Sequence, residues 1–283
     1  MRAVPKSDLT PPGFRCLSVG RVFLVVDPTL EETARALSLL SPDAVDRLFA
    51  CSGGASGRSH TALVRTPGST EKLVLRRLLH GGLLGPLLGS AFLGMSRPLR
   101  ELRVTAELQS AGAPVPRPAL AWGRRIAGPF WAPVVGTYLE PNAVDALAFL
   151  ESEPDPPRLL RAAEAMGSAV RRFHDEGGRH ADLQVKNLLV RETYDTTECV
   201  IIDLDKARIT LGLTPGERMA QIMRLFRSLL KRGVLERVGS RGCSRFFTAY
   251  CGDDRLLRRA LWKRVDRELR KVAIHKLRYQ RNT

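Results

Sequence analysis

The chain has 283 residues, of which 44% are hydrophobic and 26% charged, so its composition excludes a disordered or collagen-like protein and allows two lobes. Lys and Arg number 45 against 29 Asp and Glu. The formal net charge of +16 favours an anionic partner: nucleic acid, an acidic membrane surface or a phosphorylated small molecule. The five cysteines include no Cys-x-x-Cys pair, which argues against a zinc site or a disulfide framework and predicts reduced thiols.

Residues 1–45 are predicted to form an N-terminal extension without evident chemistry. An apolar run over 21–26 predicts a strand. Asp-Pro and Ser-Pro pairs, which are typical of helix starts, predict short helices over 28–40 and 43–49. The opening residues lack the apolar segment of a secretory signal, so no such signal is expected.

A glycine-rich turn begins the next region, residues 46–140, which is predicted to be an N-terminal lobe. Two strand candidates, 61–65 and 71–77, follow the turn as a hairpin. Glycines let backbone amides approach phosphate groups closely, which predicts a nucleotide-binding role, although glycine turns are also common in ordinary hairpins. The glycines assigned to this role are Gly53, Gly54 and Gly57.

The second strand of that hairpin includes a cation that we assign to nucleotide binding. Side-chain alternation places Arg76 and Lys72 on one face of the strand. Arg76 lies where phosphoryl transfer needs a positive charge beside the nucleotide phosphates; lysine is the usual residue there, and arginine keeps the charge with a different reach. Glu101, in the first turns of the following helix, is its expected partner. Glu107 is the other candidate for this partner. The alternative interpretation is that the glutamate is an ordinary exposed residue on the face of the helix.

The segment between Arg77 and Arg97 has no charged residue and is long enough to span a membrane. It contains Pro86 and five glycines, too many helix breakers for a lone spanning helix. The segment is therefore predicted to be a flexible apolar loop. Such a loop is a candidate for contact with a bilayer surface. The residues proposed for that contact are Leu83, Leu84, Leu87 and Leu88.

The remaining elements predict an α+β fold with two lobes. The N-terminal lobe is β-rich with one helix, and the C-terminal lobe, residues 141–283, is mostly helical, with a hinge near 138–142. Apolar residues recur every three or four positions in the first long helix of the C-terminal lobe. The predicted elements are a helix over 96–110, strands over 119–122 and 131–139, a helix over 158–176, short strands over 187–190 and 199–203, and basic helices beyond 214.

The strongest signal for chemistry is His180-Ala-Asp182-Leu-Gln-Val-Lys-Asn187, followed sixteen residues later by Asp203 at the end of an apolar strand. This spacing matches a kinase catalytic loop, H-x-D-x-x-x-x-N, and its metal-binding aspartate. Phosphoryl transfer needs a carboxylate that orients the attacking hydroxyl and accepts its proton, a role assigned to Asp182. It also needs oxygen ligands for Mg²⁺ beside the phosphates of ATP, a role assigned to Asn187 and Asp203.

Two neighbours of these residues have less direct roles. His180 is predicted to bond the backbone near Asp203 rather than to act in the chemical step. Asp205 has two open interpretations: a further acidic contact to metal or acceptor, or a turn residue that hydrogen-bonds its own backbone. The motif alone is short enough to arise by chance. The amphipathic helix before it and the apolar strand after it favour the kinase interpretation.

These residues resemble the lipopolysaccharide kinases of the protein-kinase-like superfamily, and most of all the 3-deoxy-D-manno-octulosonic acid (Kdo) kinases. The resemblance extends from about residue 53 to residue 231. Its marks are Val74-Leu-Arg-Arg77 with Gly81-Gly-Leu83, Ala113-Pro-Val-Pro-Arg-Pro118, His180-Ala-Asp182-Leu183 with Asn187, Ile202-Asp-Leu-Asp205 and Arg224-Leu-Phe-Arg-Ser-Leu229. In that family arginine can occupy the strand position at which protein kinases have lysine, which supports the assignment of Arg76.

The resemblance implies a two-lobed kinase fold with ATP between the lobes, and phosphorylation of a sugar of the lipid A–core precursor at the cytoplasmic face of the inner membrane. The looser glycine turn over 53–58 and Lys186 within the catalytic loop depart from the family pattern, which leaves the acceptor sugar open between Kdo and heptose. One alternative is a protein-kinase-like or aminoglycoside-type phosphotransferase acting on another hydroxyl. Another is an inactive kinase-like binding module, which would not need Asp182, Asn187 and Asp203 together.

The C-terminal segment, from residue 253 onward, is strongly basic and has an apolar stripe at four-residue spacing. One interpretation is a solvated helix face packed on the lobe. The other is peripheral attachment to anionic lipid or to phosphorylated lipid A. Nucleic acid is not expected as a partner, because the aromatic residues are too few among the basic cluster to make a stacking surface. The residues of the stripe are Leu257, Leu261, Val265 and Leu269.

Overall fold

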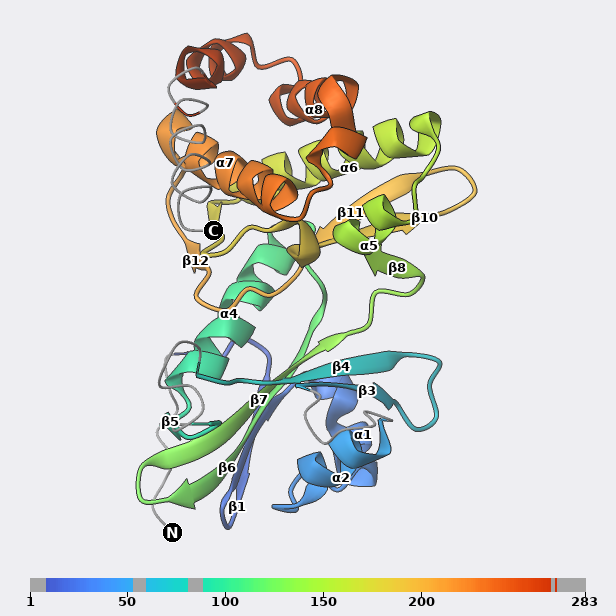
Figure 1. The fold of residues 1–283 in the computed structure, drawn as a ribbon. Helices are drawn as coiled ribbons and strands as arrows, with labels where there is room; N and C mark the ends of the chain where they lie inside the picture. Colours follow the sequence, from blue (N-terminus) through green and yellow to red (C-terminus); the bar gives the residue numbers. More distant parts are fainter. Residues whose placement is uncertain (1–8, 53–59, 81–88, 266–267, 269–283) are drawn as a thin grey trace, which may run out of the picture. The chain divides into compact units, whose positions relative to one another are not determined.

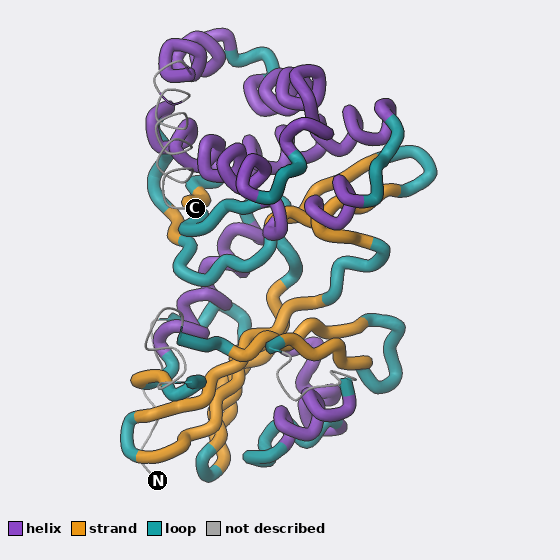
Figure 2. The backbone as a smooth tube through the Cα atoms, viewed as in Figure 1, coloured by secondary structure: helices purple, strands orange, loops and turns teal. Residues whose placement is uncertain are grey.

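The computed structural model describes residues 9–52, 60–80, 89–265 and 268. The chain forms two compact units. The first comprises residues 1–110 and 116–140, and the second comprises residues 111–115 and 141–283. Both contain strands and helices, with the larger sheet in the first and most of the helices in the second, as the colours of Figure 2 show. The α+β class predicted from the sequence is confirmed.

The first unit is built on one antiparallel sheet with the strand order β1-β2-β6-β7-β4-β3, to which β5 adds by pairing with β7 (Figure 1). The hairpin predicted over 61–65 and 71–77 is present as β3 and β4. The strands are β1 (Arg15–Val19), β2 (Val22–Val26), β3 (Thr61–Arg65), β4 (Lys72–Arg77), β5 (Phe92–Leu93), β6 (Pro118–Ala127) and β7 (Phe130–Tyr138).

Helices cover both faces of this sheet, which explains why all five residues of β2 are buried. On one face, Leu30, Ala34 and Phe49 pack with residues of the sheet in a large apolar cluster. On the opposite face, Leu99 and Leu102 pack against Phe23 and Val25 of β2 and other apolar residues. The helices are η1 (Pro28–Leu30), α1 (Glu31–Ala36) and α2 (Ala44–Cys51) on the first face, and α4 (Ser96–Ser110) on the second.

The N-terminal segment differs from its prediction in two respects. The structure shows a strand, β1, that the sequence analysis did not predict. The helix predicted over 28–40 is a 3₁₀ turn followed by α1, which ends at Ala36. The buried apolar residues between Val22 and Phe49 belong to the core of the first unit, so this part of the predicted extension packs within that unit.

The second unit contains two long helices that pack closely, α6 and α8. Asp155 begins α6 by accepting a hydrogen bond from the backbone N–H of Arg158, with proline in the first turn. At the crossing, a Cβ on Gly167 would lie 2.3 Å from the backbone oxygen of Phe246, so only glycine permits this approach. The helices are α5 (Ala146–Glu151), α6 (Pro156–Asp175), α7 (Pro215–Lys231), α8 (Leu235–Cys251) and a helix over 255–265.

The small sheets of the second unit hold the segment that contains the kinase-like motif. One has the order β11-β10-β8, and the other pairs β12 with β9. The motif itself lies between β9 and β10 and includes the short 3₁₀ helix η2 (Val185–Asn187). These strands are β8 (Ala143–Asp145), β9 (Gly178–Arg179), β10 (Leu188–Glu192), β11 (Thr197–Ile201) and β12 (Arg208–Ile209).

Across the described residues, no helix is both long and apolar enough to cross a membrane. The predicted phosphate-binding glycines, Gly53, Gly54 and Gly57, lie outside the described residues, as do Leu83, Leu84, Leu87 and Leu88 of the predicted apolar loop.

Candidate active site

The catalytic segment, which we define as residues 180–187, is held in place by two buried apolar side chains. Leu183 and Val185 are almost fully buried, whereas Asp182 between His180 and Leu183 is exposed. This arrangement follows from the sequence, because apolar and polar residues alternate over 182–186. The apolar residues fix the segment against the unit, and the carboxylate of Asp182 is left accessible to a substrate.

His180 connects the catalytic segment to the strand that leads to Asp203. Its Nδ1 accepts a hydrogen bond from the backbone N–H of Asp182 at 3.0 Å, so the proton of the neutral ring lies on Nε2, which donates to the carbonyl of Ile202 at 3.0 Å. Burial lowers the pKa of His180 and favours this neutral form. The prediction that His180 bonds the backbone near Asp203 is confirmed.

Asp182 is oriented by two amide side chains. Gln184 Nε2 donates to Asp182 Oδ2 at 2.5 Å, and Asn187 Nδ2 donates to the backbone carbonyl of Asp182 at 2.8 Å. The first bond orients the carboxylate of Asp182. The second links the end of the catalytic segment, at Asn187, to the backbone of Asp182. Gln184 was given no role in the sequence analysis, and its contact with the proposed base makes it an orienting residue.

Asn187 and Asp203 are brought together by strand pairing. The backbone N–H of Ile202 donates to the carbonyl of Asn187 at 2.9 Å, one step beyond the register of β10 with β11. Asp203 follows directly and has φ of 60°, in the left-handed region that aspartate tolerates better than most residues. An exposed carboxylate in this conformation, beside an amide, offers two oxygen ligands of the kind that Mg²⁺ prefers.

The predicted partners in the first unit also meet. The Arg76 guanidinium forms a hydrogen-bonded ion pair with the carboxylate of Glu101, which is buried on α4. Glu107, the rival partner, instead pairs with Arg103 one turn away on the same helix, at 2.6 Å. Glu101 is therefore the partner of Arg76, and the part that this pair plays in nucleotide binding stays a prediction.

The alternation proposed for β4 explains why Arg76 reaches Glu101. Leu73 and Leu75 are buried in the cluster beneath α1 and α2. On that same face Arg77 pairs with Asp46 of α2 at 2.7 Å and lies over the ring of Phe49. Arg76 and Arg77 are adjacent in sequence but make their ion pairs on opposite faces of the sheet.

The sequence analysis missed the residues of α7 that hold the catalytic segment. Gln221 Oε1 accepts from the backbone N–H of His180 at 2.7 Å, and Ser228 Oγ accepts from the backbone N–H of Val185 at 2.9 Å. Between them, Arg224 donates to the carbonyl of Ala181. The spacing of i, i+3 and i+7 places the three side chains on one face of the helix. The signals available in the sequence were this polar spacing and the family resemblance over 224–229.

We expect Ser228→Ala to slow catalysis by about tenfold, because it leaves the buried N–H of Val185 without an acceptor and loosens the segment that contains Asp182. The variant should keep its affinity for ATP, so kcat falls while KM for ATP is unchanged. Ser228→Thr, which keeps the hydroxyl, should restore most of the rate. Equal turnover of Ser228→Ala and the parent enzyme would contradict the role given to α7.

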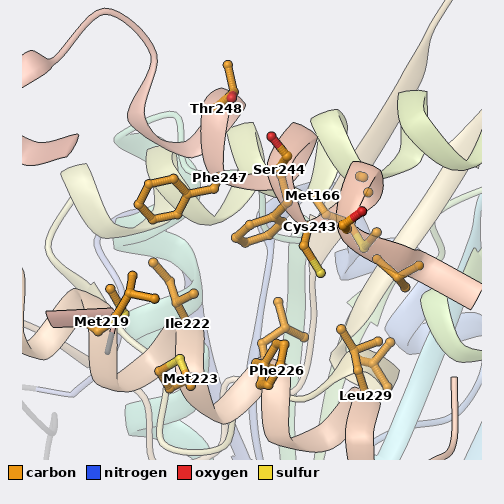
Figure 3. A pocket seen from close by; sticks show the side chains of 18 of the residues that line it. Met166, Met219, Ile222, Met223, Phe226, Leu229, Cys243, Ser244, Phe247 and Thr248 are labelled. Carbon is orange, nitrogen blue, oxygen red and sulfur yellow. The ribbon is translucent and has the colours of Figure 1, made fainter. Parts of the chain in front are cut away.

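A separate apolar cavity of about 470 Å³ lies within the second unit. Figure 3 shows Met219, Ile222, Met223, Phe226 and Leu229 of α7 on one side, with Cys243 and Phe247 of α8 on another. Asp182, Asn187 and Asp203 are not among its lining residues. With so few polar groups, this cavity does not suit a nucleotide phosphate, and we distinguish it from the phosphoryl-transfer site.

Comparison with known proteins identifies relatives of the whole catalytic region. The sequence profile of the lipopolysaccharide kinase (Kdo/WaaP) family matches residues 53–250. The 3-deoxy-D-manno-octulosonic acid kinase of Vibrio parahaemolyticus is 30% identical over 188 residues, which cover 64% of this chain and 75% of the relative. The enzyme of the same name from Actinobacillus succinogenes is 30% identical over 202 residues, covering 69% and 81%.

Among solved structures, WaaP in complex with acyl carrier protein superimposes with a TM-score of 0.57. The match covers 88% of this chain and 97% of WaaP at 22% sequence identity. At this level of identity the match shows that the two chains share a fold.

Proposed function

The chain belongs to the lipopolysaccharide kinase (Kdo/WaaP) family, and we propose that it transfers the γ-phosphate of ATP to a hydroxyl of a Kdo or heptose sugar in the lipid A–core precursor. The observation that supports this most is the exposed carboxylate of Asp182, oriented by Gln184 and set within the segment that also contains Asn187. A hydroxyl acceptor needs such a base, and the adjacent oxygen ligands suit a metal–nucleotide complex.

In the proposed reaction Asp182 accepts the proton of the sugar hydroxyl as its oxygen attacks the γ-phosphorus, and ADP leaves. Asn187 and Asp203 would hold Mg²⁺, which neutralises charge on the phosphates when bound. No cluster of three or more His, Cys, Asp or Glu side chains suited to a metal occurs among the described residues. Asn187 and Asp203 offer two oxygen ligands, which leaves coordination positions for phosphate oxygens and water.

Arg76 is proposed to bind the ATP phosphates, with Glu101 holding its guanidinium in place. The fork of the guanidinium allows it to donate to Glu101 and to a phosphate oxygen at the same time. Gly53, Gly54 and Gly57 are proposed to contribute backbone amides to the same phosphates.

The acceptor can be identified by analysing the lipopolysaccharide of a strain that lacks this gene. We expect mass spectrometry to show the loss of one phosphate from the inner core, and tandem fragmentation assigns it to Kdo or to heptose. Complementation with the parent gene should restore the phosphate, and complementation with Asp182→Asn should not. An unchanged phosphate content in the deletion strain would argue for a different acceptor.

We further propose that the enzyme works peripherally at the cytoplasmic side of the inner membrane, because its acceptor is a lipid. The basic C-terminal helices are one source of attraction to anionic headgroups. In the helix over 255–265, Leu257 and Leu261 of the predicted apolar stripe are buried. This favours the interpretation of a solvated basic face packed on the unit.

A further inference from the structure

One end of the sheet in the first unit has several large apolar side chains exposed to solvent. Val22 of β2 pairs with Arg124 of β6, so the β1–β2 turn and the β6–β7 turn lie at the same end, beside β5 (Figure 1). We call this end the hairpin edge and define it by Val19, Leu93, Ile126 and Phe130, whose exposed fractions are 54%, 73%, 44% and 41%.

The apolar residues of the hairpin edge are fixed by the sheet. Leu93 of β5 and Phe130 of β7 are register partners, so their side chains lie side by side on one face. The adjoining pair, Phe92 and Trp131, is buried on the other face. The exposed pair is thus presented by a strand ladder whose alternate residues are packed in the core, and its exposure follows from the fold.

The strands and turns that form the hairpin edge contain basic residues and no acidic ones. The described segments that form it, residues 15–26, 89–100 and 118–139, contain no Asp or Glu. Arg21 lies in the β1–β2 turn. Arg125 lies beside the β6–β7 turn, on the opposite face of the sheet from Leu93 and Phe130, and its guanidinium is 5.0 Å from the ring centroid of Trp131. A surface that combines apolar side chains with cations complements anionic lipid headgroups over acyl chains.

An acidic residue near this end, Asp46 of α2, is already neutralised. It accepts from Arg77 at 2.7 Å and from Arg124 at 2.9 Å. The nearby acid therefore does not oppose an anionic surface.

We propose that the hairpin edge is the surface through which this protein contacts an anionic bilayer, with Leu93, Ile126 and Phe130 entering the headgroup region and Arg21 and Arg125 contacting lipid phosphates. This inference rests on the proposed function, since a lipid-linked acceptor requires the enzyme to work at a membrane. It assigns an apolar part of the attachment to the first unit, whereas Leu257 and Leu261 of the predicted C-terminal stripe are buried.

Cosedimentation of the full chain with vesicles tests the proposal. Vesicles of phosphatidylglycerol and phosphatidylethanolamine are compared with vesicles of phosphatidylcholine alone. We expect the parent protein to bind the anionic vesicles. The double variant Leu93→Ser/Phe130→Ser should bind the anionic vesicles with an affinity that is lower by about tenfold or more. Arg125→Ser should bind about fivefold more weakly at low salt and like the parent protein in molar salt.

Two exposed leucines of the second unit provide matched controls. Leu211 and Leu256 are more exposed than the leucine of the hairpin edge. Leu211→Ser/Leu256→Ser should therefore bind vesicles like the parent protein. Equal loss of binding in this control and in Leu93→Ser/Phe130→Ser would overturn the proposal. So would an unchanged affinity of Leu93→Ser/Phe130→Ser, or a parent protein that binds neither vesicle.

Self-association is measured by sedimentation velocity without lipid. A parent protein that dimerises, together with a monomeric Leu93→Ser/Phe130→Ser, would show that the hairpin edge is covered by a second copy and would overturn the proposal.

Activity separates this proposal from the proposed function. Leu93→Ser/Phe130→Ser should phosphorylate a deacylated, water-soluble acceptor at the parent rate, and an acceptor embedded in anionic vesicles more slowly. A parent enzyme that is inactive on both acceptors would contradict the proposed function. The vesicle-binding experiment would then test the membrane contact of the hairpin edge without reference to activity. Equal activity of the variant on the embedded acceptor would overturn the role of the hairpin edge in catalysis at the membrane.

Discussion

Asp182→Asn is expected to reduce turnover by about a hundredfold or more, because the amide cannot accept the proton of the attacking hydroxyl. The substitution is nearly isosteric and keeps an oxygen able to accept from Gln184. Asp182 is exposed, so its replacement leaves no unpaired group in the core. The folded structure and ATP binding should therefore be preserved.

Steady-state kinetics with ATP and the lipid acceptor measure this effect, and ATP affinity is determined separately by calorimetry. Gln184→Ala is the informative companion, because it removes the hydrogen bond to Asp182 Oδ2 and keeps the base. We expect a smaller loss for Gln184→Ala than for Asp182→Asn. Turnover of Asp182→Asn at the parent rate, with unchanged dependence on Mg²⁺, would remove Asp182 from the role of base.

The catalytic segment could be predicted from the sequence because its residues are close together along the chain. The spacing of Asp182 and Asn187 is local, and the apolar strand before Asp203 provides the second half of the pattern. The Arg76–Glu101 pair was predictable for a related reason. Strand alternation fixes the face of the sheet on which Arg76 lies. The next helix along the chain, which contains Glu101, is the natural place for its partner.

The contacts of α7 could not be predicted, because each joins a helix side chain to a backbone group about 40 residues earlier. Gln221, for example, accepts from His180. Nothing local distinguishes Gln221 or Ser228 from other polar residues of an amphipathic helix. The segment 224–229 was noted for its resemblance to the family, but its physical role became visible only when the hydrogen bonds to the catalytic segment were known.

The early end of α1 shows how tertiary packing overrides a local helix signal. Ser38 adopts a φ of 53°, which turns the chain so that Leu39 is buried in the core. The carbonyl of Leu39 accepts a hydrogen bond from the indole Nε1 of Trp122 on β6 at 2.7 Å. This bond involves a residue more than 80 positions away, so the local pattern over 28–40 predicted a longer helix than the fold allows.

Arg76→Ala is expected to raise KM for ATP strongly and to lower kcat/KM, because it removes a cation proposed to bind the nucleotide phosphates. It also leaves the buried carboxylate of Glu101 without this partner, which should lower the free energy of unfolding by about 1 to 3 kcal/mol. Arg76→Lys should retain part of the activity, since the charge persists while the fork is lost.

The neighbouring residue separates nucleotide binding from stability. Arg77→Ala also breaks an ion pair, with Asp46, and it removes a contact with Phe49, but it does so on the opposite face of β4. Its unfolding free energy should fall by less than that of Arg76→Ala, because Asp46 is half-exposed and keeps its pair with Arg124, while KM for ATP stays at the parent value. Lys72→Ala tests the register of the strand. If that change impairs ATP use and Arg76→Ala does not, the nucleotide-binding cation is Lys72, and the Arg76–Glu101 pair serves the fold alone.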